Sequence, residues 1–237
     1  MSKRAVILAG GRGTRLRPYT LVLPKPLMPI GEYPILEVIV RQLIKAGFDH
    51  ITMAVNHQAK LIKAFFLDGE QWGVRIDYSE EFEPLGTMGP LKLIPDLPKN
   101  FLVMNGDILS DIDYASFFDE HVERDDDFTV SSMRRDHKID YGVLDADESG
   151  YLISFREKPL YSFQVSMGIY MASSRVLERI PLGKPYGFDN LMLDMLKEGQ
   201  PARVRAFDGY WLDIGRPDDY MQAIDEFESM KGRLFSA

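Results

Sequence analysis

The sequence has no cysteine among its 237 residues and only four histidines. A chain without thiols forms no disulfide and offers zinc no thiolate ligand. The histidines are scattered along the chain and lack the short spacings that metal sites use. The sequence therefore argues against redox and zinc chemistry.

Positive charge and long apolar runs are also scarce. The 28 Lys and Arg residues against 36 Asp and Glu give a formal net charge of −8 at pH 7. A protein that binds nucleic acid or a membrane surface in general needs a surplus of positive charge, and this chain has none. Neither a nucleic-acid partner nor a membrane partner is therefore expected. Only five apolar residues separate Arg4 from Gly10, too few for a signal-peptide core, and no run approaches membrane-spanning length. These features predict a cytoplasmic protein.

Strand-like and helix-like patterns alternate in the first half of the chain, in βαβ order. The predicted strands are residues 5–9, 51–55, 74–78 and 101–104, and the predicted helices are residues 36–44, 61–66 and 114–122. Asp113 is a plausible N-cap for the last of these helices. His121 lies on the apolar face of the same helix, which predicts a packed structural residue.

Strands dominate the second half. They are predicted at residues 128–133, 142–144, 151–155, 165–171 and 202–207, with helices at 176–180, 190–196 and from Pro217 through Phe227. The acidic run at residues 123–127 is interpreted as a solvated loop, since clustered like charges repel when buried. Together the patterns predict an α/β fold, a Rossmann-like three-layer sandwich with a mostly parallel sheet and a small antiparallel excursion. With 45% hydrophobic residues, we expect one domain over residues 1–237.

The first predicted strand runs into a glycine-rich basic loop. Gly10, Gly11 and Gly13 let the backbone turn tightly, and freed N–H groups form an anion-binding concavity. Fixed positive charge around it comes from Arg12, Arg15, Arg17 and Lys25. The loop suits a triphosphate, although a glycine turn after the first strand of any α/β domain would look similar.

Two known phosphate loops do not fit this segment. A dinucleotide-binding fingerprint needs glycine where Leu16 stands, and a Walker loop needs Gly-Lys-Ser/Thr, which does not occur. Lys25 is distinctive because Pro24 and Pro26 flank it. Proline fixes its own φ and restricts the residue before it, so these three residues predict a stiff segment that presents one ammonium group.

Residues 10–18 and 24–26 resemble the signature of the sugar-1-phosphate nucleotidyltransferases, Gly-Gly-x-Gly-Thr-Arg-Leu-x-Pro followed by Pro-Lys-Pro. Members of this family join a nucleoside triphosphate to a sugar 1-phosphate and release pyrophosphate, so the resemblance implies these two substrates. It implies catalytic roles for Arg15 and Lys25. It also implies nucleotide contacts from Leu8, Gly10, Gly11, Gly13, Thr14, Arg15, Glu81, Gly86 and Thr87.

Asp107 and Asp213 are the candidate metal ligands. Each follows a predicted strand, where ligands of open α/β sheets collect, although each could equally be an Asx turn. The resemblance favours a metal role, because the metal aspartates of the family lie in a Gly-Asp after a strand and in a Trp-x-Asp-x-Gly motif. Mg²⁺ held by both carboxylates would neutralise charge on phosphoryl oxygens.

The candidate sugar site lies on the antiparallel excursion. Glu157 and Lys158, followed by proline, are similar to the Glu-Lys-Pro of the family, whose glutamate holds sugar hydroxyls and whose lysine holds the sugar phosphate. Without the resemblance, this is an ordinary exposed turn. Gly142 and Gly168 resemble the glycines that line the sugar pocket, although many members have alanine or threonine at the position of Met167.

Residues 81–91 resemble the Glu-x-Glu-Pro-Leu-Gly-Thr-Ala-Gly-Pro-Leu segment of mannose-1-phosphate guanylyltransferases, with Met88 replacing alanine. The Glu81 carboxylate can accept from guanine N1–H and its exocyclic amine together, which favours GTP. Related uridylyltransferases also carry this glutamate, and a glycine-rich turn would explain the residues without any base contact. Mannose or heptose 1-phosphate is the expected partner of GTP. Uridylyl, cytidylyl or thymidylyl transfer, a non-sugar phosphate acceptor and a non-catalytic sensor remain alternatives.

Many relatives continue into a left-handed β-helix, so the resemblance implies that this chain is the catalytic domain alone. The expected mechanism is in-line attack of a sugar-phosphate oxygen on the α-phosphorus, with catalysis by positioning and electrostatics. The sequence leaves the sugar and the oligomeric state open, a homo-oligomer included.

Overall fold

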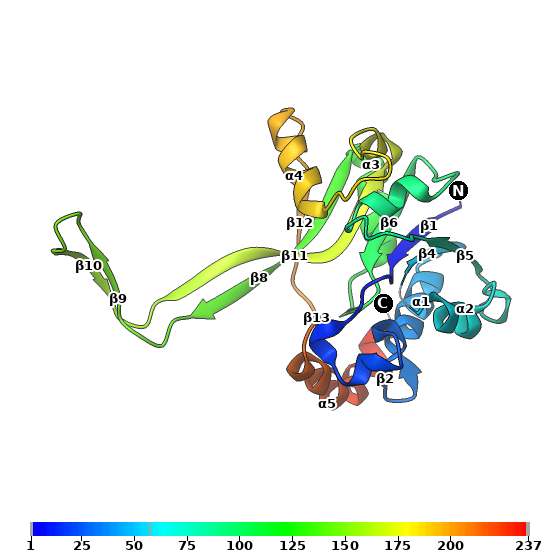
Figure 1. The fold of residues 1–237 in the computed structure, drawn as a ribbon, viewed down its shortest axis with the longest axis horizontal. Helices are drawn as coiled ribbons and strands as arrows, with labels where there is room; N and C mark the ends of the chain where they lie inside the picture. Colours follow the sequence, from blue (N-terminus) through cyan, green and yellow to red (C-terminus); the bar gives the residue numbers. More distant parts are fainter. Residues whose placement is uncertain (1, 57, 236–237) are drawn as a thin grey trace.

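The structure is a computed structural model and describes residues 2–56 and 58–235. Its centre is a seven-stranded sheet in the order β12-β8-β11-β6-β1-β4-β5 (Figure 1). The strands are β1 (Arg4–Leu8), β4 (His50–Val55), β5 (Arg75–Glu80), β6 (Asn100–Asn105), β8 (Phe128–Lys138), β11 (Leu160–Ser173) and β12 (Arg203–Phe207). Only β11 is antiparallel to its neighbours, β6 and β8, while the other pairs are parallel. The mostly parallel sheet is confirmed.

Alternating side chains divide the core between the two faces of this sheet. In β1, Ala5 and Ile7 belong to one buried cluster and Val6 to the other, as the two-residue period of a strand requires. The first face is covered by α1 (Ile35–Lys45), α2 (Ala59–Phe66), α3 (Tyr114–Arg124) and α5 (Pro217–Leu234). The second is covered by α4 (Phe188–Lys197) and two short 3₁₀ segments, η5 (Gly89–Leu93) and η6 (Ser174–Glu178). The three-layer α/β sandwich is therefore confirmed.

Local signals define the helix ends. The Asp113 carboxylate accepts the Ser116 N–H at 2.9 Å and caps α3, and Pro217 is the first residue of α5. The helix predicted at 176–180 is instead the 3₁₀ segment η6. Pro181 explains the difference, because a proline disfavours helical backbone in the residue before it and leaves too little length for an α-helix.

The acidic run at residues 123–127 is not simply solvated. Its first two residues end α3, and its aspartates form ion pairs with cations from other elements. Asp125 pairs with Lys99 and Arg175, and Asp127 pairs with Arg175. The basic partners lie far away in the sequence, so the local charge pattern could not reveal them.

Two small antiparallel sheets complete the body. They pair β7 (Ile108–Ser110) with β13 (Trp211–Asp213), and β2 (Pro29–Ile30) with β3 (Tyr33–Pro34). Among the residues described, no helix is both long enough and apolar enough to cross a membrane.

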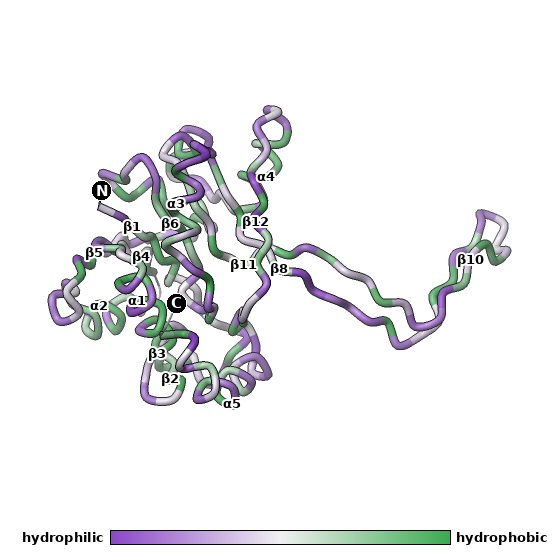
Figure 2. The backbone as a smooth tube through the Cα atoms, turned by 180° about the vertical axis from the view of Figure 1, so that it is seen from behind, coloured by the Kyte–Doolittle hydropathy of each residue, from purple (hydrophilic) through white to green (hydrophobic). Residues whose placement is uncertain are grey.

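The predicted antiparallel excursion forms an arm, which we define as residues 134–166. Strands β8 and β11 leave the sheet as a two-stranded ribbon that ends in the hairpin of β9 (Val143–Ala146) and β10 (Leu152–Arg156) (Figures 1 and 2). The ribbon projects away from the body, and no residue of the arm is buried.

Candidate active site

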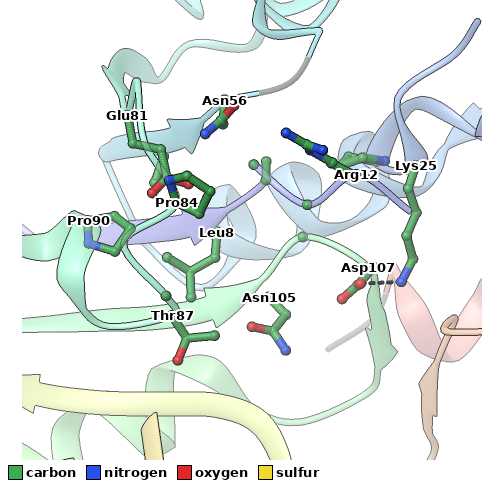
Figure 3. A pocket seen from close by; sticks show the side chains of 17 residues that line it. Leu8, Arg12, Lys25, Asn56, Glu81, Pro84, Thr87, Pro90, Asn105 and Asp107 are labelled. Atoms are coloured by element: carbon green, nitrogen blue, oxygen red, sulfur yellow. Dashed lines mark hydrogen bonds and ion pairs between the residues drawn. The ribbon is translucent and has the colours of Figure 1, made fainter. Parts of the chain in front are cut away.

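A cavity of about 420 Å³ opens where parallel strands of the central sheet end. Leu8 ends β1 and Asn105 ends β6, while Asn56 and Glu81 directly follow β4 and β5. All four line the cavity, and Figure 3 shows their side chains around it. Carboxyl ends of parallel strands are where open α/β sheets bind ligands, as the sequence predicted for this edge.

The glycine loop forms one wall of the cavity. Gly10 and Gly11 line it directly after β1. A Cβ atom on Gly10 would lie 2.9 Å from Oε1 of Glu81 and 3.2 Å from Cβ of Asn56, closer than ordinary contacts allow. Gly13 has a φ of 57°, a left-handed conformation that favours glycine, and its carbonyl accepts the Thr20 hydroxyl at 2.7 Å. Glycine is therefore needed at position 10 because Glu81 and Asn56 lie too close for a side chain. At position 13 it is favoured because the backbone is left-handed.

Lys25 presents its ammonium group to the Asp107 carboxylate. Pro24 is extended, and the short 3₁₀ turn Lys25–Leu27 follows it, so the backbone is held on both sides of the lysine. The Lys25 side chain is only 10% exposed and pairs with Oδ2 of Asp107 (Figure 3). Arg12 also lines the cavity and adds a second cation. The structure thus gathers positive charge next to a carboxylate at one end of the cavity.

Asp107 and Asp213 are brought together by the pairing of β7 with β13. Asp107 directly precedes β7, and Asp213 stands opposite Ile108 in the antiparallel register. The Ile214 N–H donates to the Asp107 carbonyl at 3.1 Å. Desolvation and the nearby Asp107 charge raise the pKa of Asp213 above its usual range, against the opposing effect of Lys25. The Asp107 and Asp213 carboxylates are therefore close enough for the charge of one to affect the protonation of the other.

These two carboxylates fit a hard divalent cation. Oδ1 of Asp107 is buried and has no hydrogen-bond partner in the described part of the chain. A cation bound there would satisfy this oxygen and relieve the repulsion that raises the Asp213 pKa. In residues 2–56 and 58–235, no group of three or more His, Asp or Glu side chains forms a metal cage. Mg²⁺ suits such a site, because it binds through one or two carboxylates together with substrate phosphates.

Arg15 and Thr14 lie in the 3₁₀ turn Thr14–Leu16, next to the cavity but outside its lining. A Cβ atom on Gly215 would lie 3.4 Å from Nη2 of Arg15, so the guanidinium borders the loop that follows Asp213. Its charge opposes the rise in the Asp213 pKa. Arg15 therefore adds positive charge on the Asp213 side, while Arg12 and Lys25 line the cavity itself.

Glu81 lies on the opposite side of the cavity, in the predicted base-recognition segment. Its Oε2 accepts the Leu85 N–H at 3.1 Å, which fixes the carboxylate beside Gly10. Gly86 has a φ of 78°, and a Cβ atom there would lie 2.8 Å from the Tyr186 carbonyl oxygen. The Thr87 hydroxyl accepts the Phe188 N–H at 2.7 Å. The segment is thus anchored on the first turn of α4.

Residues of the predicted sugar site are separated. Gly168, with a φ of 73°, lies at an irregularity in β11, where a Cβ atom would be 2.7 Å from Nδ2 of Asn105. Gly142, Glu157 and Lys158 lie together on the arm instead, since a Cβ atom on Gly142 would be 3.2 Å from Oε2 of Glu157. None of these three lines the cavity of its own chain.

Several residues of the cavity lining were not singled out from the sequence as ligand contacts, among them Asn56, Pro84 and Asn105. A signal existed for the two asparagines, because each stands at the carboxyl end of a predicted parallel strand. Pro84 lies in the loop after β5 and belongs to residues 81–91, so the resemblance marked its segment but not this residue as a ligand contact.

Comparisons with known proteins find relatives along most of the chain. The chain is 35% identical to a UTP–glucose-1-phosphate uridylyltransferase from Synechocystis sp., over 93% of this chain and 62% of that protein. It is 34% identical to a mannose-1-phosphate guanylyltransferase catalytic subunit beta from Drosophila melanogaster, also over 93% and 62%. The chain thus spans less than two thirds of the length of these curated relatives.

Solved structures share the fold along nearly their whole length. A putative glucose-1-phosphate thymidylyltransferase from Bacillus anthracis superposes with a TM-score of 0.77 at 25% identity, covering 95% of this chain and 94% of that one. HddC from Yersinia pseudotuberculosis, complexed with GMP-PN, gives a TM-score of 0.71 at 29% identity, covering 95% and 99%. The sequence profile described as "Nucleotidyl transferase" matches residues 4–230. The chain belongs to the nucleotidyl transferase family.

Proposed function

We propose that this protein transfers a nucleotidyl group from a nucleoside triphosphate to a sugar 1-phosphate, giving a nucleotide sugar and pyrophosphate. The observation that carries the proposal is the Lys25–Asp107 ion pair at the strand-end cavity, with Asp213 beside it. A cation and two carboxylates next to a glycine loop are what phosphoryl transfer requires, because its catalysis is mainly positioning and charge stabilisation. The resemblance of the motifs and the names of the relatives support the same reaction class.

The proposed reaction is a single in-line displacement. A sugar 1-phosphate oxygen forms a bond to the α-phosphorus as the bond from that phosphorus to pyrophosphate breaks, so no covalent enzyme intermediate is needed. Lys25 bridges the sugar phosphate and the α-phosphate, and Arg15 neutralises the leaving phosphates. Lys158 positions the attacking phosphate. Asp107 and Asp213 would hold Mg²⁺, which would supply further charge neutralisation on the phosphoryl oxygens.

We propose GTP as the nucleotide, with mannose 1-phosphate or a heptose 1-phosphate as the acceptor. The Glu81 carboxylate, held in place beside Gly10, can accept two guanine donors. Relatives named as mannose-1-phosphate guanylyltransferases and the GMP-PN complex of HddC support this choice. The uridylyltransferase relative keeps UTP with glucose 1-phosphate as the second candidate.

The test is pyrophosphate release in the presence of Mg²⁺, across the four ribonucleoside triphosphates and dTTP, against a panel of sugar 1-phosphates and phosphocholine. Turnover with GTP and mannose or heptose 1-phosphate is the expected result. Turnover with UTP, CTP or dTTP instead would retain the reaction and contradict the role of Glu81. No turnover in any combination would contradict the proposed function.

A matched pair of variants tests the base contact. Glu81→Gln replaces an acceptor by an amide, so we expect the ratio of kcat/KM for GTP over UTP to fall by roughly 10-fold or more, the cost of one mismatched hydrogen-bonding group. Glu83→Gln makes the same change two residues later, at an exposed position outside the cavity lining. It should leave the ratio unchanged, and equal ratios for both variants would contradict base recognition by Glu81.

A further inference from the structure

We infer that the arm of one chain docks on a second copy of this chain and places Glu157 and Lys158 at the nucleotide cavity of that copy. The inference rests on the proposed function for the role of these two residues. It adds that each active site is built from two chains.

The arm exposes an unusual number of large apolar side chains to water. Eight large hydrophobic side chains on it are exposed, each by at least 55%: Tyr141, Leu144, Tyr151, Leu152, Ile153, Phe155, Leu160 and Phe163. Figure 2 shows hydrophobic segments out to the end of the ribbon. An isolated two-stranded ribbon is marginally stable at best, and monomers rarely expose large contiguous apolar patches. The arm therefore exposes enough apolar surface to serve as a contact with another chain.

The ribbon is held in a direction that leads away from its own cavity. Its register is continuous from Ser166 opposite Ser132 to Leu160 opposite Lys138. At its base the Arg135 guanidinium lies 4.8 Å from the centre of the Trp211 ring. Strand β8 runs from the central sheet into the ribbon as one strand, Phe128–Lys138, so folding the arm back would bend this strand. Its ladder with β11 shifts register between Ser166 and Tyr170, where the arm leaves the sheet. In this arrangement Glu157 and Lys158 lie outside the cavity of their own chain.

A second copy is the occupant that matches what the arm carries. Glu157 and Lys158 are the residues proposed to hold the sugar phosphate, whereas the described cavity lining contains no residue of the arm. Lys158 has a φ of 44°, a left-handed conformation that is rare for lysine and that persists mainly at functional sites. An unrelated partner would have no use for these groups. A second copy has a cavity that lacks them.

Two-fold symmetry would limit this assembly to a dimer. If each arm docks on the other chain about a two-fold axis, the contact is isologous and closes as a dimer. Both apolar arms are then covered, and the dimer has two complete sites. The geometry thus accounts for the exposed arm and the separated sugar-site residues with one arrangement.

Complementation between two inactive chains is the decisive test. Chains with different affinity tags are co-expressed, one with Lys25→Ala and the other with Lys158→Ala, and the heterodimer is purified through both tags. Each variant alone should lose most of its turnover. The heterodimer should regain about half of the wild-type turnover per dimer, because one of its two sites combines an intact cavity with an intact arm. A heterodimer as inactive as its parents, beside an active wild type, would overturn the inference.

The oligomeric state gives a test that does not depend on turnover. Light scattering should report a dimer for the wild type and a monomer for Leu152→Asp/Ile153→Asp, with unchanged circular dichroism. Leu193→Asp is the control, since Leu193 is 54% exposed on α4, outside the arm, and should remain dimeric. An active wild-type monomer would show instead that the arm folds back on its own chain. If no substrate turns over but the arm variant alone dissociates, the proposed function fails while the docking of the arm stands.

Discussion

The ammonium group of Lys25 is held against Asp107 by the backbone around two prolines. We expect Lys25→Ala to lower kcat by ~10² or more, the typical cost of removing one preorganised charge-stabilising group. Steady-state pyrophosphate release measures the effect. The control is Lys197→Ala, which removes a 74% exposed lysine from α4. Unchanged turnover in the Lys25 variant would exclude it from the reaction.

We expect the ionised Asp213 side chain to destabilise the folded protein when no metal is bound. Its pKa is raised in the folded state by desolvation and by Asp107, so its contribution to stability is present at low pH and is lost as pH rises through the folded-state pKa. Asp213→Asn should therefore raise Tm at pH 7 without metal. Mg²⁺ should raise the Tm of the wild type but have little effect on the variant.

The matched control is Asp208→Asn, at an exposed aspartate outside the cavity lining. Its Tm and its response to Mg²⁺ should equal those of the wild type. If Mg²⁺ stabilises Asp213→Asn as strongly as the wild type, Asp213 is not a metal ligand.

At the scale of single elements, the N-cap of α3 is a signal that the sequence and the structure share. Asp113→Ala removes the acceptor of the Ser116 N–H, so we expect the free energy of unfolding to fall by about 1 kcal/mol. Urea denaturation measures it. Asp225→Ala is the control, because Asp225 is exposed in the interior of α5, where alanine is the better helix former. Equal stabilities of the two variants would contradict the capping role.

Elements with strong local patterns were predicted well, and elements stabilised by distant partners were not. The helix over α1 and the strands β1, β4 and β6 follow from their apolar periodicity. Strands β8 and β11 are longer than their buried parts, which were all that the sequence indicated, because their outer halves pair only with each other on the arm. The β7–β13 pairing, which joins Asp107 to Asp213, left no local signal.

At the scale of the whole molecule, the pH dependence of the free energy of unfolding should reflect one buried neutral histidine. His121 is 1% exposed, and its Nδ1 lies 2.8 Å from the Thr129 hydroxyl, so the predicted packed role is confirmed. Burial lowers the pKa of His121 to about 4. The unfolded chain therefore binds a proton first, and stability falls as pH drops from about 6.5 to 4, by up to about 1.4 kcal/mol per pH unit.

Urea denaturation as a function of pH checks this dependence. His121→Gln removes the titrating group and should flatten the profile between pH 6.5 and 4. The control is His137→Gln, because His137 is exposed on the arm and should leave the slope unchanged. A wild-type profile that is already flat would show that His121 does not titrate in this range.

The sequence by itself determined the features that neighbouring residues encode. The period of apolar residues specified the layers. The loop and the orientation of one cation followed from the glycines after β1 and the prolines around Lys25. The motifs indicated the family. These signals are local because they depend on backbone conformation and on spacing along the chain.

Only the tertiary structure decided which distant groups meet. It brought Asp213 to Asp107 through β13 and β7, placed Glu81 against Gly10, and carried Glu157 and Lys158 away on the arm. Such contacts depend on strand pairing between segments far apart in the sequence, and a strand pattern specifies which face is apolar but not which strand it pairs with. The same physics explains why the sequence indicated the parts of the site but not their arrangement.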